Sequence, residues 1–159
     1  MVSNTKPEAV QKAIKYCALL LKSRPRSEKE LTDKLKKKSF NDIDIAQTLD
    51  FLKKNTLIND QLLAQDWIES QIKKHFGIKK IVLKLKSKGI DEQIIKNQIQ
   101  KIETGYSEEK AVVIIAKEQL NKLKNLDSEK AKSRVYGYLL RRGFSQEIIT
   151  DVLEKLIPE

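Results

Sequence analysis

The sequence predicts an all-α fold in which three tandem three-helix repeats form an elongated helical array. Three observations predict it: a recurring apolar pattern, capping signals between short amphipathic segments, and the lack of a Val/Thr-rich alternating run typical of a strand. The apolar pattern is clearest in residues 78–102, where it follows helical spacing on both sides of Gly89 and Asp91. Glycine suits a left-handed helix end and aspartate suits a helix start, so this segment predicts a helical hairpin.

The same hairpin pattern occurs three times, aligned on Phe40, Ile90 and Phe144. The positions at −9, −5, +5, +9 and +12 from these residues carry only Leu, Ile or Val. They are Leu31, Leu35, Ile45, Leu49 and Leu52; Ile81, Leu85, Ile95, Ile99 and Ile102; and Val135, Leu139, Ile149, Leu153 and Leu156. The spacing of 50 and then 54 residues is typical of an array of helical units.

In chain order, residues 1–6 are expected to be a disordered N-terminus and residues 7–56 the first repeat of one continuous array. Pro7 starts a helix that ends near Lys22, since proline is favoured in a first turn. Ser27 and Glu30 form an S-x-x-E capping box for a helix through Lys38, and Asn41 or Asp42 caps a third helix to about Asn55. Ser39 stands where the other repeats have glycine, so a left-handed conformation there would cost about 1 kcal/mol.

Residues 57–103 and 106–157 are expected to repeat this arrangement. The helix before the second hairpin begins at Asn59 or Asp60, and the one before the third begins at Ser107. Asp127 or Ser128 caps the next helix, Gly143 and Phe144 turn the chain, and Pro158 ends the last helix.

The charge of +10 is unevenly distributed. Segments 22–38, 73–90 and 130–142 carry +5, +7 and +5, which leaves the rest of the chain near −7. Each segment covers the first helix of a hairpin, so regular stacking predicts a basic stripe along one side. Such a stripe suits a polyanion or an acidic protein groove, although solvation of exposed helix faces explains the same charges.

The residues that carry chemistry are sparse. His75 is the one histidine, and neither a metal-ligand spacing nor a phosphate-cradling glycine motif is present. We therefore expect no catalytic site, metal or cofactor. Cys17 lies among apolar residues and is expected to be a buried thiol, and the lack of a signal or membrane segment favours a cytoplasmic protein.

Four segments in order resemble the signatures of the RecX regulatory proteins, which are bacterial modulators of the RecA recombinase. They are RPRSEKELTDKLKKKSF, LINDQLLAQDWI, KKIVLKLKSKGI and YLLRRGFSQEIITDVL. The resemblance as a whole spans from about Pro7 to Leu156. Each segment alone is a weak signal, whereas the ordered set is specific to the family.

The resemblance implies a monomeric, elongated, curved right-handed-type helical array of three tandem three-helix repeats that lies in the groove of the RecA filament on single- or double-stranded DNA. There it would restrain filament growth, ATP hydrolysis, strand exchange and coprotease activity in the SOS response. The family motifs match Arg24, Arg26, Ser27, Glu30, Leu31, Asn59, Asp60, Ala64, Lys80, Ile81, Leu85, Lys88, Gly89, Arg142, Gly143 and Phe144.

A structural role explains many of these: Ser27 and Asp60 as caps, Gly89 and Gly143 as helix ends, and Leu31, Leu35, Leu85, Leu139 and Phe144 as core. For binding RecA or DNA we expect the exposed cations Arg24, Arg26, Lys36, Lys37, Lys79, Lys80, Lys84, Lys88, Arg134, Arg141 and Arg142.

The sequence departs from the family pattern at four positions. Thr56 and Ser39 stand where the family often has glycine, which affects turn geometry. Gln71 replaces a common arginine and Lys84 a common acid, which alters the surface charge.

Two other functions fit the same features. A nucleic-acid-binding helical repeat that acts without RecA would lose affinity steeply with salt. A protein scaffold that never meets nucleic acid would show a partner whose binding is insensitive to nuclease.

Overall fold

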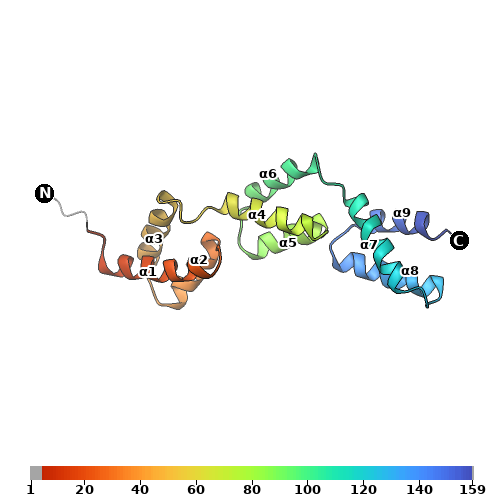
Figure 1. Ribbon diagram of the computed structural model, residues 1–159. Helices are drawn as coiled ribbons and strands as arrows, with labels where there is room; N and C mark the ends of the chain where they lie inside the picture. Colours follow the sequence, from red (N-terminus) through yellow and green to blue (C-terminus); the bar gives the residue numbers. More distant parts are fainter. Residues whose placement is uncertain (1–4, 159) are drawn as a thin grey trace.

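The computed structural model describes residues 5–158, and within them the chain forms nine α-helices and no strand. The all-α prediction is confirmed. The helices group in threes along the chain (Figure 1). They are α1 (Glu8–Ser23), α2 (Glu28–Lys37), α3 (Asp42–Lys54), α4 (Asp60–Lys73), α5 (Ile78–Ser87), α6 (Glu92–Glu103), α7 (Glu108–Lys122), α8 (Ser128–Arg141) and α9 (Gln146–Leu156).

Each group of three helices encloses its own apolar cluster. The repeated Leu, Ile and Val positions are buried in these clusters, except that Leu49, Ile102 and Leu156 are partly buried and pack against them. Phe144 is buried in the third cluster, as predicted. Ile58, which lies past the expected boundary at residue 56, packs into the first cluster. The repeat deduced from the apolar pattern is therefore a repeat of cores.

The helix starts follow the capping signals. Ser27 Oγ accepts from the Glu30 amide at 3.1 Å, and a Glu30 carboxylate oxygen accepts from the Ser27 amide at 3.1 Å, which completes the capping box. Asn59, and not Asp60, caps α4, because its side chain accepts from the Gln61 and Leu62 amides. The role of Asp60 as a cap for α4 was therefore predicted wrongly; its carboxylate is used elsewhere.

The middle helices of the three repeats, α2, α5 and α8, end in the same backbone conformation. Gly89 and Gly143 have φ of 74° and 92°, and Ser39 has the same left-handed geometry at 65°. Thr56 and His75, which follow the ends of α3 and α4, are also left-handed, each with φ of 56°. The turn geometry is thus kept where the expected glycine is missing.

The array is elongated, and the two ends of the chain lie at its opposite ends (Figure 1). Its curvature and handedness stay predictions. Of the expected disordered N-terminus, residues 1–4 lie outside the described part, whereas the ammonium of Lys6 lies 4.3 Å from the ring centre of Phe51. Within the described residues, no helix has the length and apolarity needed to cross a bilayer.

Inter-repeat junctions and candidate interaction surface

The first junction joins the start of α2 to the second repeat. Ser27 Oγ donates to the carbonyl of Lys88, at the end of α5, over 2.5 Å. The Glu28 amide donates to Oδ1 of Asp60 at 3.1 Å. Unsatisfied amides at a helix N-terminus need acceptors, and here the next repeat supplies one. This explains why Asp60 is not a cap for its own helix.

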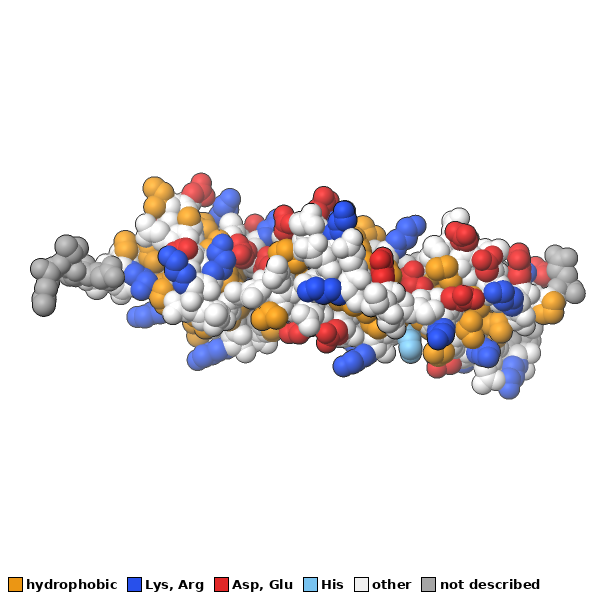
Figure 2. All heavy atoms as spheres, turned by 90° about the horizontal axis from the view of Figure 1, so that it is seen from above, with side chains coloured by type: hydrophobic (Ala, Val, Ile, Leu, Met, Phe, Trp, Pro, Cys, Tyr) orange, Lys and Arg blue, Asp and Glu red, His pale blue; other side chains and the backbone are white. Residues whose placement is uncertain are grey.

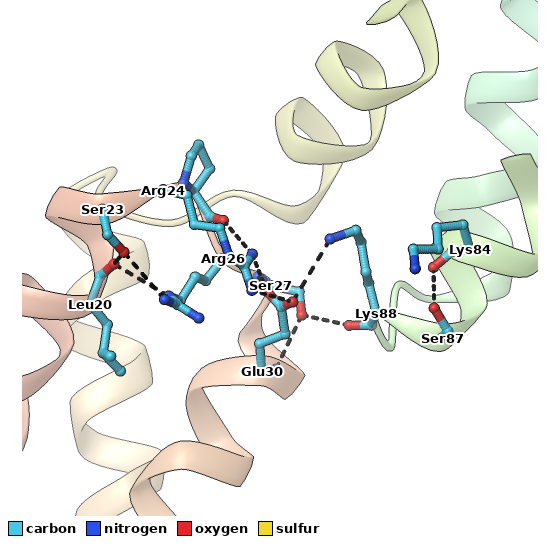
Figure 3. A network of polar contacts seen from close by, with 10 residues as sticks. Leu20, Ser23, Arg24, Arg26, Ser27, Glu30, Lys84, Ser87 and Lys88 are labelled. Carbon is cyan, nitrogen blue, oxygen red and sulfur yellow. Dashed lines mark hydrogen bonds and ion pairs between the residues drawn. The ribbon is translucent and has the colours of Figure 1, made fainter. Parts of the chain in front are cut away.

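An ionic network covers this junction (Figure 3). Arg24 pairs with Glu30 at 3.1 Å, and the ammonium of Lys88 lies 3.8 Å from the same carboxylate. Partial burial acts to raise the pKa of Glu30, but the hydrogen bonds from Arg24 and from the Ser27 amide outweigh it and lower the pKa. Glu30 therefore stays ionised and links the two repeats.

The second junction repeats the first one with different residues. The Gly77 amide donates to the carbonyl of Arg142, at the end of α8, over 2.8 Å. The Ile78 amide donates to Oε1 of Glu108 at 2.8 Å. In both junctions, therefore, the N-terminus of one middle helix (α2 or α5) contacts the end of the middle helix of the next repeat (α5 or α8). The same N-terminus also contacts an acid in the first turn of α4 or α7. The helices α8, α5 and α2 thus follow one another end to end.

Further contacts reinforce the second junction. The Tyr106 hydroxyl donates to the Phe76 carbonyl at 3.0 Å, and burial together with the charge of Glu108 raises the pKa of Tyr106 to about 12. A Cβ on Gly77 would lie 2.2 Å from the carbonyl carbon of Gly143. Only glycine allows the two backbones to approach this closely.

Arg142 is a structural residue of this junction. Its guanidinium donates to the carbonyls of His75, at 3.2 Å, and of Lys74. It also lies 4.2 Å from the ring centre of Phe76, a cation–π distance. Arg142 is half-buried, so its predicted place among the exposed cations is wrong.

The same correction applies to Arg26 and Lys88, which are also half-buried. The guanidinium of Arg26 donates to the Leu20 carbonyl at 3.3 Å and to Ser23 Oγ at 3.3 Å. These contacts hold the turn between α1 and α2. The charged groups of Arg26 and Lys88 are therefore both engaged in contacts within the protein.

Lys80 and Arg24 are exposed but also engaged. The ammonium of Lys80 donates to the Arg141 carbonyl at 3.2 Å and lies 4.7 Å from the ring centre of Phe76. We call the remaining six predicted cations the basic surface. All six are exposed, and no carboxylate within the described residues forms an ion pair with them: Lys36, Lys37, Lys79, Lys84, Arg134 and Arg141.

The basic surface belongs to α2, α5 and α8, two residues from each. Because these helices lie end to end, its cations are distributed along the array. The face shown in Figure 2 also carries acidic side chains over all three repeats. That face of the molecule is therefore not uniformly basic.

No cluster of three or more His, Cys, Asp or Glu side chains suited to a metal ion occurs in the described part of the chain. Cys17 is fully buried, and burial raises the pKa of its thiol to about 11. A thiol in this state is a poor nucleophile at neutral pH. His75 contributes its carbonyl to the second junction.

Family models for the first, second and third three-helix domains of RecX match residues 9–52, 59–97 and 107–153. The chain is also 30% identical over 156 residues to "Regulatory protein RecX" of Mycobacterium sp. (strain JLS), covering 94% of this chain and 84% of the relative. The chain belongs to the RecX family.

Other RecX proteins agree with this assignment. The Regulatory protein RecX of Clostridium botulinum (strain Eklund 17B / Type B) is 29% identical over 134 residues, which cover 83% of this chain and 62% of the relative. A crystal structure of RecX from Lactobacillus salivarius superposes with a TM-score of 0.78 at 24% identity, covering 94% of this chain and 97% of that one. The tandem three-helix repeat is thus also the fold of a solved RecX.

The junction residues as a class were not predicted from the sequence. Glu108, Tyr106 and Gly77 were not singled out as sites, and Asp60 was given a local role. One signal was available: an acid occupies the first turn of both helices that follow a hairpin, at Asp60 and Glu108. Its partner is a backbone amide 30 or more residues away, which no local pattern identifies.

Proposed function

We propose that this RecX protein is a non-enzymatic regulator that lies along the RecA–DNA filament and restrains filament extension, ATP hydrolysis, recombination and coprotease activity. The observation that carries the proposal is the spacing of the basic surface along three repeats held by two matching junctions. A filament repeats its surface at regular intervals, so cations spaced along the array in fixed positions can contact successive subunits at once. Joined contacts of this kind gain affinity through effective concentration.

The test is RecA ATP turnover on single-stranded DNA with added protein. Wild type should slow turnover in a saturable way. The variant Lys79→Glu with Lys84→Glu should need at least about tenfold more protein for the same effect, since like charges across an interface are repulsive. Lys80 is left unchanged in this variant because its ammonium contacts the second junction.

A matched control carries the same charge change on the same repeat. Lys96→Glu with Lys101→Glu alters exposed residues of α6 and should inhibit as wild type does. Both double variants should melt near the wild-type temperature, because exposed charges contribute little to folding. Unchanged ATP turnover at saturating wild-type protein would rule out the proposal.

The second candidate is a nucleic-acid-binding repeat protein that acts independently of RecA. It is favoured by the net charge of +10 and by the unpaired arginines of α8. It predicts that naked DNA binds as tightly as the filament at physiological salt, with a steep dependence on salt. Much tighter binding to the filament would exclude it.

A further inference from the structure

Gly137 lies in the interior of α8, where glycine weakens a helix relative to alanine. Three glycines at helix ends have packing reasons: Gly77, Gly89 and Gly143 each face another repeat at a distance that excludes a Cβ. Gly137 faces none. The one atom near a Cβ placed there is Nη1 of Arg141, at 3.3 Å. The missing side chain therefore leaves open space under a guanidinium.

That space is part of a groove of about 380 Å³ between α7 and α8, which we call the arginine groove. Its polar lining comes from Gln119, Ser133, Arg134, Tyr138 and Arg141, and Leu123 supplies an apolar wall. Within the described residues, no acidic residue lines it and neither arginine has a carboxylate partner. Two positive charges thus face one hollow without compensation.

The two arginines are placed as a pair. They are seven residues apart on α8, which is two helical turns or roughly 10 Å along the axis, and Gly137 lies between them. A larger residue at 137 would fill the middle of the groove. Glycine keeps the groove open at a cost to the helix.

We infer that the arginine groove binds the sugar-phosphate backbone of single-stranded DNA, with Arg134 and Arg141 as the phosphate ligands. Guanidinium forks match phosphate oxygens with two parallel hydrogen bonds. Ser133 and Gln119 add neutral donors, and Leu123 and the Tyr138 ring offer a wall for the sugar. A flat acidic protein surface would not need the hollow over Gly137. This inference deepens the proposed function and rests on it, since it assigns the third repeat to the DNA within the filament.

The experiment measures fluorescence anisotropy of a labelled single-stranded oligonucleotide without RecA. Arg134→Gln and Arg141→Gln should each weaken binding about fivefold or more. Each should also lower the slope of log affinity against log salt by about 0.7, because one phosphate contact is lost. Arg134→Lys and Arg141→Lys keep the charge and should still lose affinity, because lysine cannot make the paired contact.

Gly137→Ala gives a more specific signature. It should raise the melting temperature, because alanine favours the helix, and at the same time weaken oligonucleotide binding, because its methyl group presses on Arg141. A substitution that only damaged the fold would lower both. Lys130→Gln, an exposed cation of α8 outside the groove, is the control and should bind as wild type does.

The inference is overturned if the groove variants bind the oligonucleotide as tightly as wild type, or if Lys130→Gln loses as much affinity as they do. It is also overturned if they lose affinity for DNA-free RecA alone, which would make the partner an acidic protein surface. Its failure is distinct from failure of the proposed function. If the groove variants slow RecA ATP turnover normally and bind DNA as tightly as wild type does, only the assignment of the groove is wrong. If wild type does not slow ATP turnover but the groove variants lose DNA binding, the proposed function is wrong and the groove remains a DNA-binding site.

Discussion

At the scale of the residue, three left-handed helix ends show where a neighbouring repeat requires glycine. They are Ser39, Gly89 and Gly143. All three close a middle helix with a left-handed backbone. A Cβ on Gly89 would lie 2.1 Å from Cδ of Lys29, and one on Gly143 would lie 2.6 Å from the Lys80 amide nitrogen. Ser39 belongs to the first repeat and is exposed, so its side chain has room and only the backbone strain remains.

This difference predicts opposite effects for reciprocal substitutions. Ser39→Gly should raise the free energy of unfolding by up to about 1 kcal/mol, because it relieves left-handed strain. Gly143→Ser should lower it by about 2–5 kcal/mol, since it adds that strain and a collision with the backbone of Lys80. Chemical denaturation measures both. If Gly143→Ser lowered the free energy of unfolding by no more than Ser39→Gly raises it, the second junction would not require glycine.

Residue-scale roles could be predicted from the sequence where the physics is local. The Ser27–Glu30 capping box and the glycine helix ends depend on neighbours within a few residues, and these predictions are confirmed. Arg142 could not be assigned, because its partners lie 67 and 68 residues away in the carbonyls of His75 and Lys74. An arginine beside a helix end is typical of an exposed cation until the neighbouring repeat is in place.

At the scale of the element, α2 and α5 begin without enough acceptors of their own. Gly77 gives α5 no side-chain cap, and Glu108 of the next repeat accepts from its first amide. Asp60 does the same for α2. A carboxylate at a helix N-terminus also interacts favourably with the helix dipole. The helix boundaries could be predicted from the sequence. The acceptors that another repeat supplies to the first amides of α2 and α5 could not.

Asp60 makes this arrangement pH-dependent. Burial is the main cause that raises its pKa above the ordinary value, against the lowering effect of the Glu28 amide. A carboxyl with a higher pKa in the folded state contributes its stability below the unfolded pKa and loses it as pH rises through the folded pKa. Asp60→Asn keeps an oxygen acceptor without the charge. It should therefore raise the melting temperature at pH 7 by about 1–2 °C, with little effect near pH 3.

Circular dichroism at the two pH values measures this change. Asp91→Asn is the comparison, since Asp91 is an exposed cap within its own repeat. It should show no such gain at neutral pH. A lower melting temperature of Asp60→Asn at pH 7 would mean that the ionised carboxylate stabilises the junction.

At the scale of the whole molecule, three separate apolar clusters are joined by polar contacts. Leu35, Leu85 and Leu139 hold the same place in the three clusters, and each is fully buried. Removing one should therefore weaken its own repeat first, as in other arrays where each unit contacts only its neighbours. The number of repeats and their cores could be predicted from the apolar spacing, whereas the direction of the exposed charges depends on how the junctions orient the repeats.

Leu85→Ala should cost about 2–5 kcal/mol, the usual effect of a buried leucine. Amide hydrogen exchange should lose protection chiefly in α4, α5 and α6. Leu35→Ala is the matched variant and should shift the loss to α1, α2 and α3. Equal loss across all the helices with either variant would show that the array unfolds as a single unit.

The contacts that cap the N-termini of α2 and α5 at the two junctions have a donor side and an acceptor side. The first repeat supplies donors at Ser27 and Glu28, and the third supplies acceptors at Arg142 and Glu108. In these capping contacts, within the described residues, only the second repeat supplies both, with donors at Gly77 and Ile78 and acceptors at Lys88 and Asp60. It is therefore the one unit that tandem duplication can multiply with compatible joints, so lengthened descendants of this protein would arise by copying its centre and keeping both ends.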